Sequence, residues 1–327
     1  MNQAISRLRV FSMIFIVAYH CICYYGVWTF QHEVLYSNIQ YWRSVCEIAL
    51  NMFVFISGFL FANSYLNKNN GRGLGSILKK KVTRLLIPLI VWSIVSIVLF
   101  PCEKPVLSFF CGVYHLWFLM MLFGTFVVSA IFVRRLAAMA VPVQFLVVVF
   151  FVLLEPTINR LVRADTLNLF RWREIVHYLP SFLTGFLMVS GEWEEKINKL
   201  SPVLSSFVVI ISLSLAVYIA GNILPLSGLY SKYPMIIFFV FVYTILHCYI
   251  SRPSTVILSL DRCSMGIYII HHILIWGIIY YIPSSQALMK EHYIIAPLIL
   301  FIMVFPVSYI ITRILLSNKG TAKLIGA

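Results

Sequence analysis

The sequence predicts an all-α protein: a polytopic transmembrane helical bundle of about ten spans, with both termini in the cytoplasm. Hydrophobic residues make up 61% of the 327 residues and charged residues only 11%, whereas soluble domains have about 45–50% and about 25%. Apolar runs near the roughly 20 residues that cross a bilayer recur along the whole chain. The basic residues behind the net charge of +14 collect at the ends of those runs, which is typical of membrane topology.

The apolar runs divide the chain into ten expected spans. The first run is too long for a cleavable signal peptide and no small-residue cleavage site follows it, so we expect it to remain as a span. The fifth and sixth runs are the shortest. No internal repeat is visible, and we expect one transmembrane domain over residues 1–327. The expected spans cover residues 8–27, 44–66, 82–100, 115–133, 141–154, 175–189, 203–220, 233–250, 265–282 and 293–315.

Positive charge sets the expected orientation. With a cytoplasmic N-terminus, 17 of the 25 Lys and Arg residues fall on the cytoplasmic side and eight fall outside, in agreement with the positive-inside rule. An even number of spans then returns the C-terminus to the same side. Because neither zinc-finger spacing nor a basic stripe interleaved with polar residues occurs, we expect no nucleic-acid partner.

The first span contains the leading candidate for chemistry, His20. Ionisable groups inside a membrane are costly and tend to be functional, although a structural histidine is the alternative. Arg9 precedes His20 by eleven residues, which places the ring roughly 16 Å deeper at the helical rise of 1.5 Å per residue. An imidazole titrates near neutral pH, so His20 could act there as a general base.

The third span begins with basic residues, among them Lys81 and Arg84. The two are three residues apart and so are expected to share one helix face at the cytoplasmic end. Lysine and arginine bind phosphate groups, which predicts a phosphate clamp. The alternative, an ordinary positive-inside anchor, stays open.

Further polar residues lie at the outer ends of spans or inside them. His115 and Trp117 stand at the outer mouth of the fourth span, where an aromatic belt is the alternative interpretation. Tyr268, His271 and His272 lie within the ninth span. Because neighbouring residues of a helix point about 100° apart, we expect only one of these two histidines to face the bundle interior.

The second span carries Glu47 and Asn51 one helical turn apart, followed by Ser57 and Gly58. The first pair could face a polar interior, and the second pair lets helices approach closely. The seven cysteines have no metal-ligand spacing apart from a bare C-x-C. They are interpreted as small buried hydrophobic residues, and no metal is expected.

Six short motifs occur in order along nearly the whole chain. They are Arg9 with His20; Phe55-Ile56-Ser57-Gly58-Phe59; Lys81 with Arg84 and Pro88; His115-Leu116-Trp117-Phe118-Leu119; Tyr178 with Pro180, Phe182 and Gly185; and Ser264 with Ile267, Tyr268 and His271. In this order they resemble the acyltransferase-3 family of bacterial integral-membrane acyltransferases. The sequence is similar to the short, single-domain members, and we expect no esterase-like domain of the kind that some members append.

The resemblance implies a ten-span protein of the bacterial cytoplasmic (inner) membrane. It implies transfer of an acyl group, usually acetyl from acetyl-CoA, to a hydroxyl of a cell-surface carbohydrate, whether polymeric or lipid-linked. His20 is then expected to be catalytic, as a base or as an acyl carrier, and Arg9, Lys81 and Arg84 are expected to bind the phosphates of CoA. The residues expected to line the acceptor side are His115, Trp117, Tyr268, His271, Asn51 and Ser57.

Two features leave alternatives open. Many family members carry an acid where Asn51 stands and the pattern W-S-L-x-x-E where this chain has Trp117-Phe118-Leu119-Met120-Met121-Leu122, so carboxylate assistance to His20 and the identity of the acceptor stay open. Intramembrane His and Arg residues also suit a proton-coupled transporter or a flippase for a polar solute or lipid-linked sugar. The oligomeric state is not predicted.

Overall fold

The computed structural model describes residues 3–23, 39–66, 74–100, 102–161, 167–191, 193, 201–222, 238, 240, 242–243, 245–246 and 254–327. Across these residues the regular structure is helical, without a strand. The principal helices are α1 (Gln3–Ile22), α3 (Ile39–Leu66), α4 (Leu74–Lys81), α5 (Ile87–Leu99), α6 (Pro105–Cys111), α7 (Trp117–Ala137), α8 (Val141–Leu161), α9 (Trp172–Ser190), α11 (Pro202–Asn222), α13 (Thr255–Tyr281), α14 (Pro283–Glu291), α15 (Ile295–Leu316) and α16 (Lys319–Ala322).

Short turns of other helix types join these elements. A π-helical turn, η3, connects α4 to α5, and 3₁₀ turns precede α7 and α9 and follow α16. The turns are η3 (Val82–Leu86), η4 (Tyr114–Leu116), η5 (Leu169–Arg171) and η6 (Lys323–Ile325).

Six helical segments of the described residues are long and apolar enough to cross a membrane, which confirms a multi-pass helical protein. They are Gln3–Ile22, Cys46–Leu66, Gly75–Leu99, Pro105–Ala137, Thr255–Tyr281 and Ile295–Leu316. The expected fifth, sixth and seventh spans lie on α8, α9 and α11. The eighth, over residues 233–250, lies largely outside the described residues. The count of ten spans and the cytoplasmic placement of the termini stay predictions.

The π turn η3 has a physical cause in the sequence. Pro88 follows Arg84 by four residues, so it has no N–H to donate to the Arg84 carbonyl, and its ring would collide with that carbonyl in a regular helix. The wider turn over Val82–Leu86 relieves this collision, and Pro88 is then the second residue of α5. The helical segment that corresponds to the expected third span therefore begins in α4, earlier than the expected boundary at residue 82.

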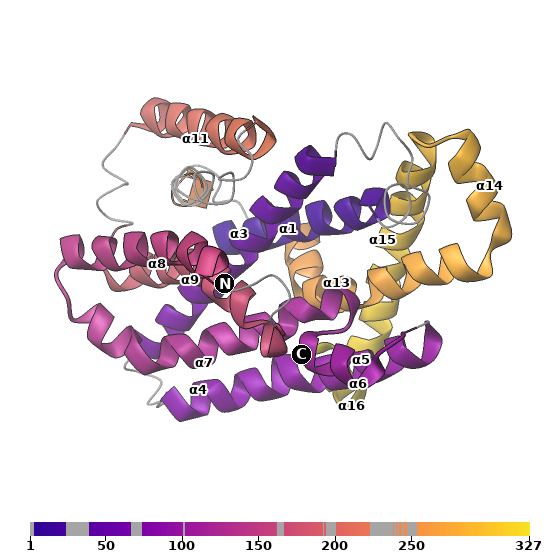
Figure 1. Ribbon diagram of the computed structural model, residues 1–327, viewed down its shortest axis with the longest axis horizontal. Helices are drawn as coiled ribbons and strands as arrows, with labels where there is room; N and C mark the ends of the chain where they lie inside the picture. The colour runs from indigo at the N-terminus through magenta and orange to yellow at the C-terminus, as the bar shows by residue number, and fades with distance from the viewer. Residues whose placement is uncertain are drawn as a thin grey trace.

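The centre of the bundle is built around α1, α3 and α13, while α11 and α14 lie towards the edges (Figure 1). Helix α3 packs closely on α9 because two glycines bring their backbones together. A Cβ atom on Gly58 would lie 2.0 Å from the carbonyl oxygen of Phe182, and one on Gly185 would lie 2.0 Å from that of Phe55. The expected close approach at Ser57 and Gly58 is thus confirmed for Gly58.

Helices α1 and α13 run in the same direction, side by side. Arg9 on α1 pairs with Asp261 on α13, and eleven residues later His20 contacts His271, ten residues beyond Asp261. Both intervals span about 15–16 Å of helix. Two polar contacts therefore join the helices at separate levels of the bundle, and they mark the two sites described next.

Candidate functional site

The first site is a cluster of four histidine rings from three elements. His20 lies near the end of α1, His115 in η4, and His271 and His272 on α13. His20 is 9% exposed and the other three at most 2%. Nδ1 of His20 lies 2.7 Å from Nε2 of His271, and the His115 ring stacks on His272 with centroids 4.2 Å apart. The ring centroids of His115 and His271 are 5.3 Å apart.

The hydrogen bonds fix the tautomer of the first two rings. Nδ1 of His271 lies 3.0 Å from the carbonyl oxygen of Ile267. A carbonyl only accepts, so this nitrogen carries the hydrogen and Nε2 of the neutral ring is an acceptor. His20 must then donate through Nδ1 to His271. The lone pair of the neutral His20 ring consequently lies on Nε2, the nitrogen that can take up a proton.

The expectation that only one of His271 and His272 faces the interior is wrong, because both are fully buried in the cluster. Helix α13 is enclosed on more than one side: α1 and α15 pack along it, and the ring of His115 covers His272. Two side chains about 100° apart on the helix therefore both reach the polar interior.

Tyr268 and Trp276 make hydrogen bonds to the other two histidines of the cluster, His115 and His272. The hydroxyl of Tyr268 donates to the carbonyl oxygen of His115, and Nε1 of Trp276 donates to Nε2 of His272 at 2.9 Å. In the described part of the chain, both ring nitrogens of His115 are buried without a hydrogen-bond partner. Such groups cost free energy unless a ligand or water satisfies them, so the cluster has hydrogen-bonding capacity for a polar guest.

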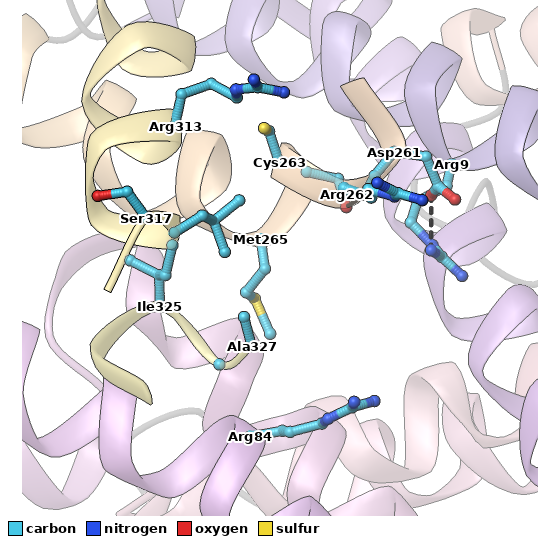
Figure 2. A pocket seen from close by; sticks show the side chains of 13 residues that line it. Arg9, Arg84, Asp261, Arg262, Cys263, Met265, Arg313, Ser317, Ile325 and Ala327 are labelled. Carbon is cyan, nitrogen blue, oxygen red and sulfur yellow. Dashed lines mark hydrogen bonds and ion pairs between the residues drawn. The ribbon is translucent and has the colours of Figure 1, made fainter. Parts of the chain in front are cut away.

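The second site is a pocket of about 630 Å³ at the other level of α1. Figure 2 shows its charged side chains, with a dashed line between Arg9 and Asp261. It is lined by Arg9, Arg84, Asp261, Arg262, Cys263, Ser264, Met265, Arg313, Leu316, Ser317, Ile325, Gly326 and Ala327. The lining thus comes from α1, η3, α13, α15 and the segment around η6.

The charge of this pocket favours an anion. Four arginine side chains line it against one aspartate, Asp261, whose carboxylate accepts from Arg9 at 2.5 Å and from the hydroxyl of Ser6 at 2.8 Å. The guanidinium groups of Arg84, Arg262 and Arg313 add further positive charge. Guanidinium groups match phosphate oxygens in a bidentate fashion, so a ligand with several phosphate groups suits this lining.

The residues expected from the sequence fall into groups. His20, His115, Tyr268 and His271 come together in the histidine cluster. Arg9 and Arg84 line the pocket, whereas Lys81 places Nζ 4.1 Å from the centroid of the Phe126 ring. Lys81 ends α4 and Arg84 lies in the π turn η3 that follows, so the common face expected for the two residues stays a prediction.

The remaining three expected residues are placed as follows. Asn51 donates to Glu47, one helical turn away, at 2.8 Å and accepts from the hydroxyl of Ser181 at 2.6 Å. Trp117 lies under the guanidinium of Arg171, 5.6 Å away. Ser57 is half-buried on α3 beside Gly58. Whether any of these three touches a substrate stays a prediction.

Sequence reasoning missed Asp261, Arg262 and Arg313 as parts of a site. Arg262 and Arg313 are among the 17 basic residues of the expected cytoplasmic side, where positive charge indicates membrane topology as well as a binding site. Asp261 is an acid just before the expected ninth span, and an acid so close to an apolar run is a signal of a polar site. Within the described residues no group of three or more His, Cys, Asp or Glu side chains is arranged to hold a metal ion.

Comparison with known proteins identifies the family. A family profile described as an acyltransferase domain matches residues 2–313, which is essentially the whole chain. No curated protein and no solved structure matches the chain. The match agrees with the six ordered motifs and with the multi-pass helical fold. The chain therefore belongs to the acyltransferase-3 family of membrane acyltransferases.

Proposed function

We propose that the protein transfers an acetyl group from acetyl-CoA to a hydroxyl of a cell-surface carbohydrate, at the bacterial cytoplasmic membrane. The observation that carries the proposal is the arrangement on α1. Arg9 lines the pocket with three other arginines, and His20 enters the histidine cluster eleven residues later, roughly 16 Å along the same helix. A donor with phosphates at one end and a reactive group at the other suits this arrangement.

Acetyl-CoA has that shape. Its phosphates lie on the nucleotide end, and its thioester stands at the tip of the extended pantetheine arm. In the proposed complex Arg9, Arg84, Arg262 and Arg313 hold the phosphates, and the arm runs along α1 and α13 towards His20. Lys81, the last residue of α4, stays a predicted contact of the same phosphates.

The chemical step uses Nε2 of His20. This nitrogen takes the proton from the acceptor hydroxyl while the hydroxyl oxygen attacks the thioester carbonyl carbon. The tetrahedral intermediate collapses, the carbon–sulfur bond breaks, and the CoA thiolate receives the proton from the His20 imidazolium. General-base help of this kind contributes typically 10²–10⁴ in rate. An acyl group carried briefly by His20 would be bound at the same nitrogen, and that route stays open.

His271 supports this step by holding His20. Through the 2.7 Å contact it keeps the His20 ring in the tautomer that presents a lone pair at Nε2. It continues to accept the hydrogen bond from Nδ1 of His20 when that ring becomes positive. His115, with unsatisfied nitrogens, is placed to contact the acceptor or the developing oxyanion. Trp117, Tyr268, Asn51 and Ser57 are proposed to line the acceptor side.

The test is a His20→Ala variant in membranes supplied with radiolabelled acetyl-CoA. The surface carbohydrate of the host cells, stripped of its O-acetyl groups by mild alkali, serves as acceptor. We expect transfer to be lost while the amount of folded protein and the binding of CoA are kept, because Arg9 and the pocket are unchanged. His292→Ala, an exposed histidine at the end of α14, is the control. Normal transfer by His20→Ala would refute the assignment, and absence of CoA binding by the wild type would favour the transporter alternative.

A further inference from the structure

Strained backbone gathers at one contact near the histidine cluster. Three non-glycine residues of the described chain have positive φ: Tyr114 at 44°, Phe170 at 53° and Arg171 at 58°. Gly112 has a φ of 83°. Positive φ is costly for residues with a side chain and persists only where the surroundings impose it, often at functional sites. These four residues belong to two segments that touch each other, the turn at residues 111–114 and η5.

Arg171 is the side chain that joins the two segments. Its Nε donates to the carbonyl oxygen of Cys111, and a terminal nitrogen donates to that of Gly112 at 3.4 Å. Another terminal nitrogen pairs with Glu174 at 3.0 Å, and the guanidinium lies 5.6 Å over the ring of Trp117. One planar group therefore holds two carbonyls, an acid and an aromatic face, which a lysine could not do.

The turn that Arg171 holds leads directly to His115. Gly112 lies so close to Trp117 that a Cβ atom would stand 2.5 Å from the Trp117 Cα. The amide of Leu116 donates to the carbonyl of Val113 at 2.9 Å, which closes η4 around His115. The position of the His115 ring against His271 and His272 consequently depends on the conformation of this turn.

We infer that Arg171 is a positioning residue for the acceptor side of the reaction. By holding the strained turn at residues 111–114, it fixes His115 beside the His20–His271 pair. This inference rests on the proposed acyl transfer. The arginine pocket lies about 16 Å from the cluster along α1, so Arg171 acts on the acceptor step and leaves donor binding unchanged.

The experiment compares Arg171→Ala, Arg171→Lys and Arg173→Ala in the full-length protein. Arg173 is the matched control, since its guanidinium lies over the Trp172 ring, 5.5 Å away. Transfer from radiolabelled acetyl-CoA to the de-O-acetylated surface carbohydrate is measured together with the dissociation constant of CoA. For Arg171→Ala we expect kcat to fall about 10- to 100-fold, the scale of a misplaced active-site group, with CoA affinity unchanged. Arg171→Lys should lose part of the activity and Arg173→Ala none.

Two further readouts separate positioning from loss of the fold. Added methylguanidine should restore part of the activity of folded, purified Arg171→Ala, which a folding defect would not allow. Hydrogen exchange of the amides at residues 112–114 should become faster in Arg171→Ala than in Arg173→Ala, because the strained turn is released.

The outcomes are distinct for this inference and for the proposed function. Activity of Arg171→Ala equal to that of Arg173→Ala, weakened CoA binding, or exchange rates unchanged at residues 112–114 would each overturn the role of Arg171. If the wild type transfers no acetyl group while Arg171→Ala still shows faster exchange in the turn, the proposed function fails. In that case the inference about catalysis falls with it, and only the structural contact stands.

Discussion

At the scale of single residues, the contact between His20 and His271 decides what the intramembrane histidine can do. A lone imidazole could present either nitrogen to a substrate. Here the Ile267 carbonyl fixes the proton on His271, and His271 in turn fixes the proton on His20. The second histidine thus takes the orienting role that a carboxylate has in many catalytic groups, although it brings no negative charge.

Replacing His271 by leucine should therefore lower kcat without changing the KM for acetyl-CoA. The lost hydrogen bond to a charged ring is worth about 1.5–3 kcal/mol, which corresponds to roughly 10- to 100-fold in rate. Asparagine at this position, which can still accept a hydrogen bond, should recover part of the activity. The measurement is steady-state transfer from acetyl-CoA, with His292→Leu as the control. Full activity in His271→Leu would exclude the orienting role.

At the scale of elements, the contact between α3 and α9 forms the framework around the polar residues. The two glycines, Gly58 and Gly185, allow backbone-to-backbone contact. The same pair of helices is also joined by polar bonds, from Tyr178 to Glu47 at 2.9 Å and from Ser181 to Asn51 at 2.6 Å. Close packing at the glycines brings these side chains within reach of one another, so the polar bonds depend on that contact.

Gly185→Ala should destabilise the folded protein, because the new Cβ atom would lie 2.0 Å from the Phe55 carbonyl oxygen. Overpacking of this kind costs about 1–3 kcal/mol. The thermal midpoint of the detergent-solubilised protein should fall. Gly277→Ala is the matched control, since an added Cβ atom there has no neighbour within 4 Å. A midpoint for Gly185→Ala equal to that of Gly277→Ala would contradict the close contact.

At the scale of the whole molecule, the fold separates two kinds of polar site along one pair of parallel helices. The arginine pocket collects positive charge where α1 and α13 begin and α15 ends. The histidine cluster lies farther along the same two helices, and its described lining is aromatic and imidazole-rich. The proposed phosphate binding and the proposed proton transfer are thereby kept apart.

Arg313→Gln should weaken the binding of CoA about tenfold or more, the value of a lost charged hydrogen bond. The dissociation constant is measured by calorimetry at low and high salt, and the wild type should show the steeper salt dependence because it has one more charge facing the ligand. Arg135→Gln, an exposed arginine at the end of α7, is the control. Equal affinities for the two variants would place the phosphates elsewhere.

The sequence by itself determined the class of fold and the family, and it singled out His20 as the candidate for chemistry. These follow from local quantities: the hydrophobicity of each run, the charges at its ends and the order of short motifs. It also predicted that Arg9 and Arg84 would serve one anionic ligand, and both line the same pocket. Prolines and glycines also carry structural information in the sequence. Pro88 explains the π turn, and the two glycines explain the contact of α3 with α9.

Only the tertiary structure decided which side chains meet. The rotation of each helix about its axis determines whether His272 joins His271 in the interior and whether Arg262 and Arg313 reach the pocket of Arg9. That rotation is set by packing against neighbours far away in the chain, and a periodic apolar run contains little information about it. The strained turn under Arg171 is likewise imposed by contacts between distant segments, so local sequence preferences do not predict it.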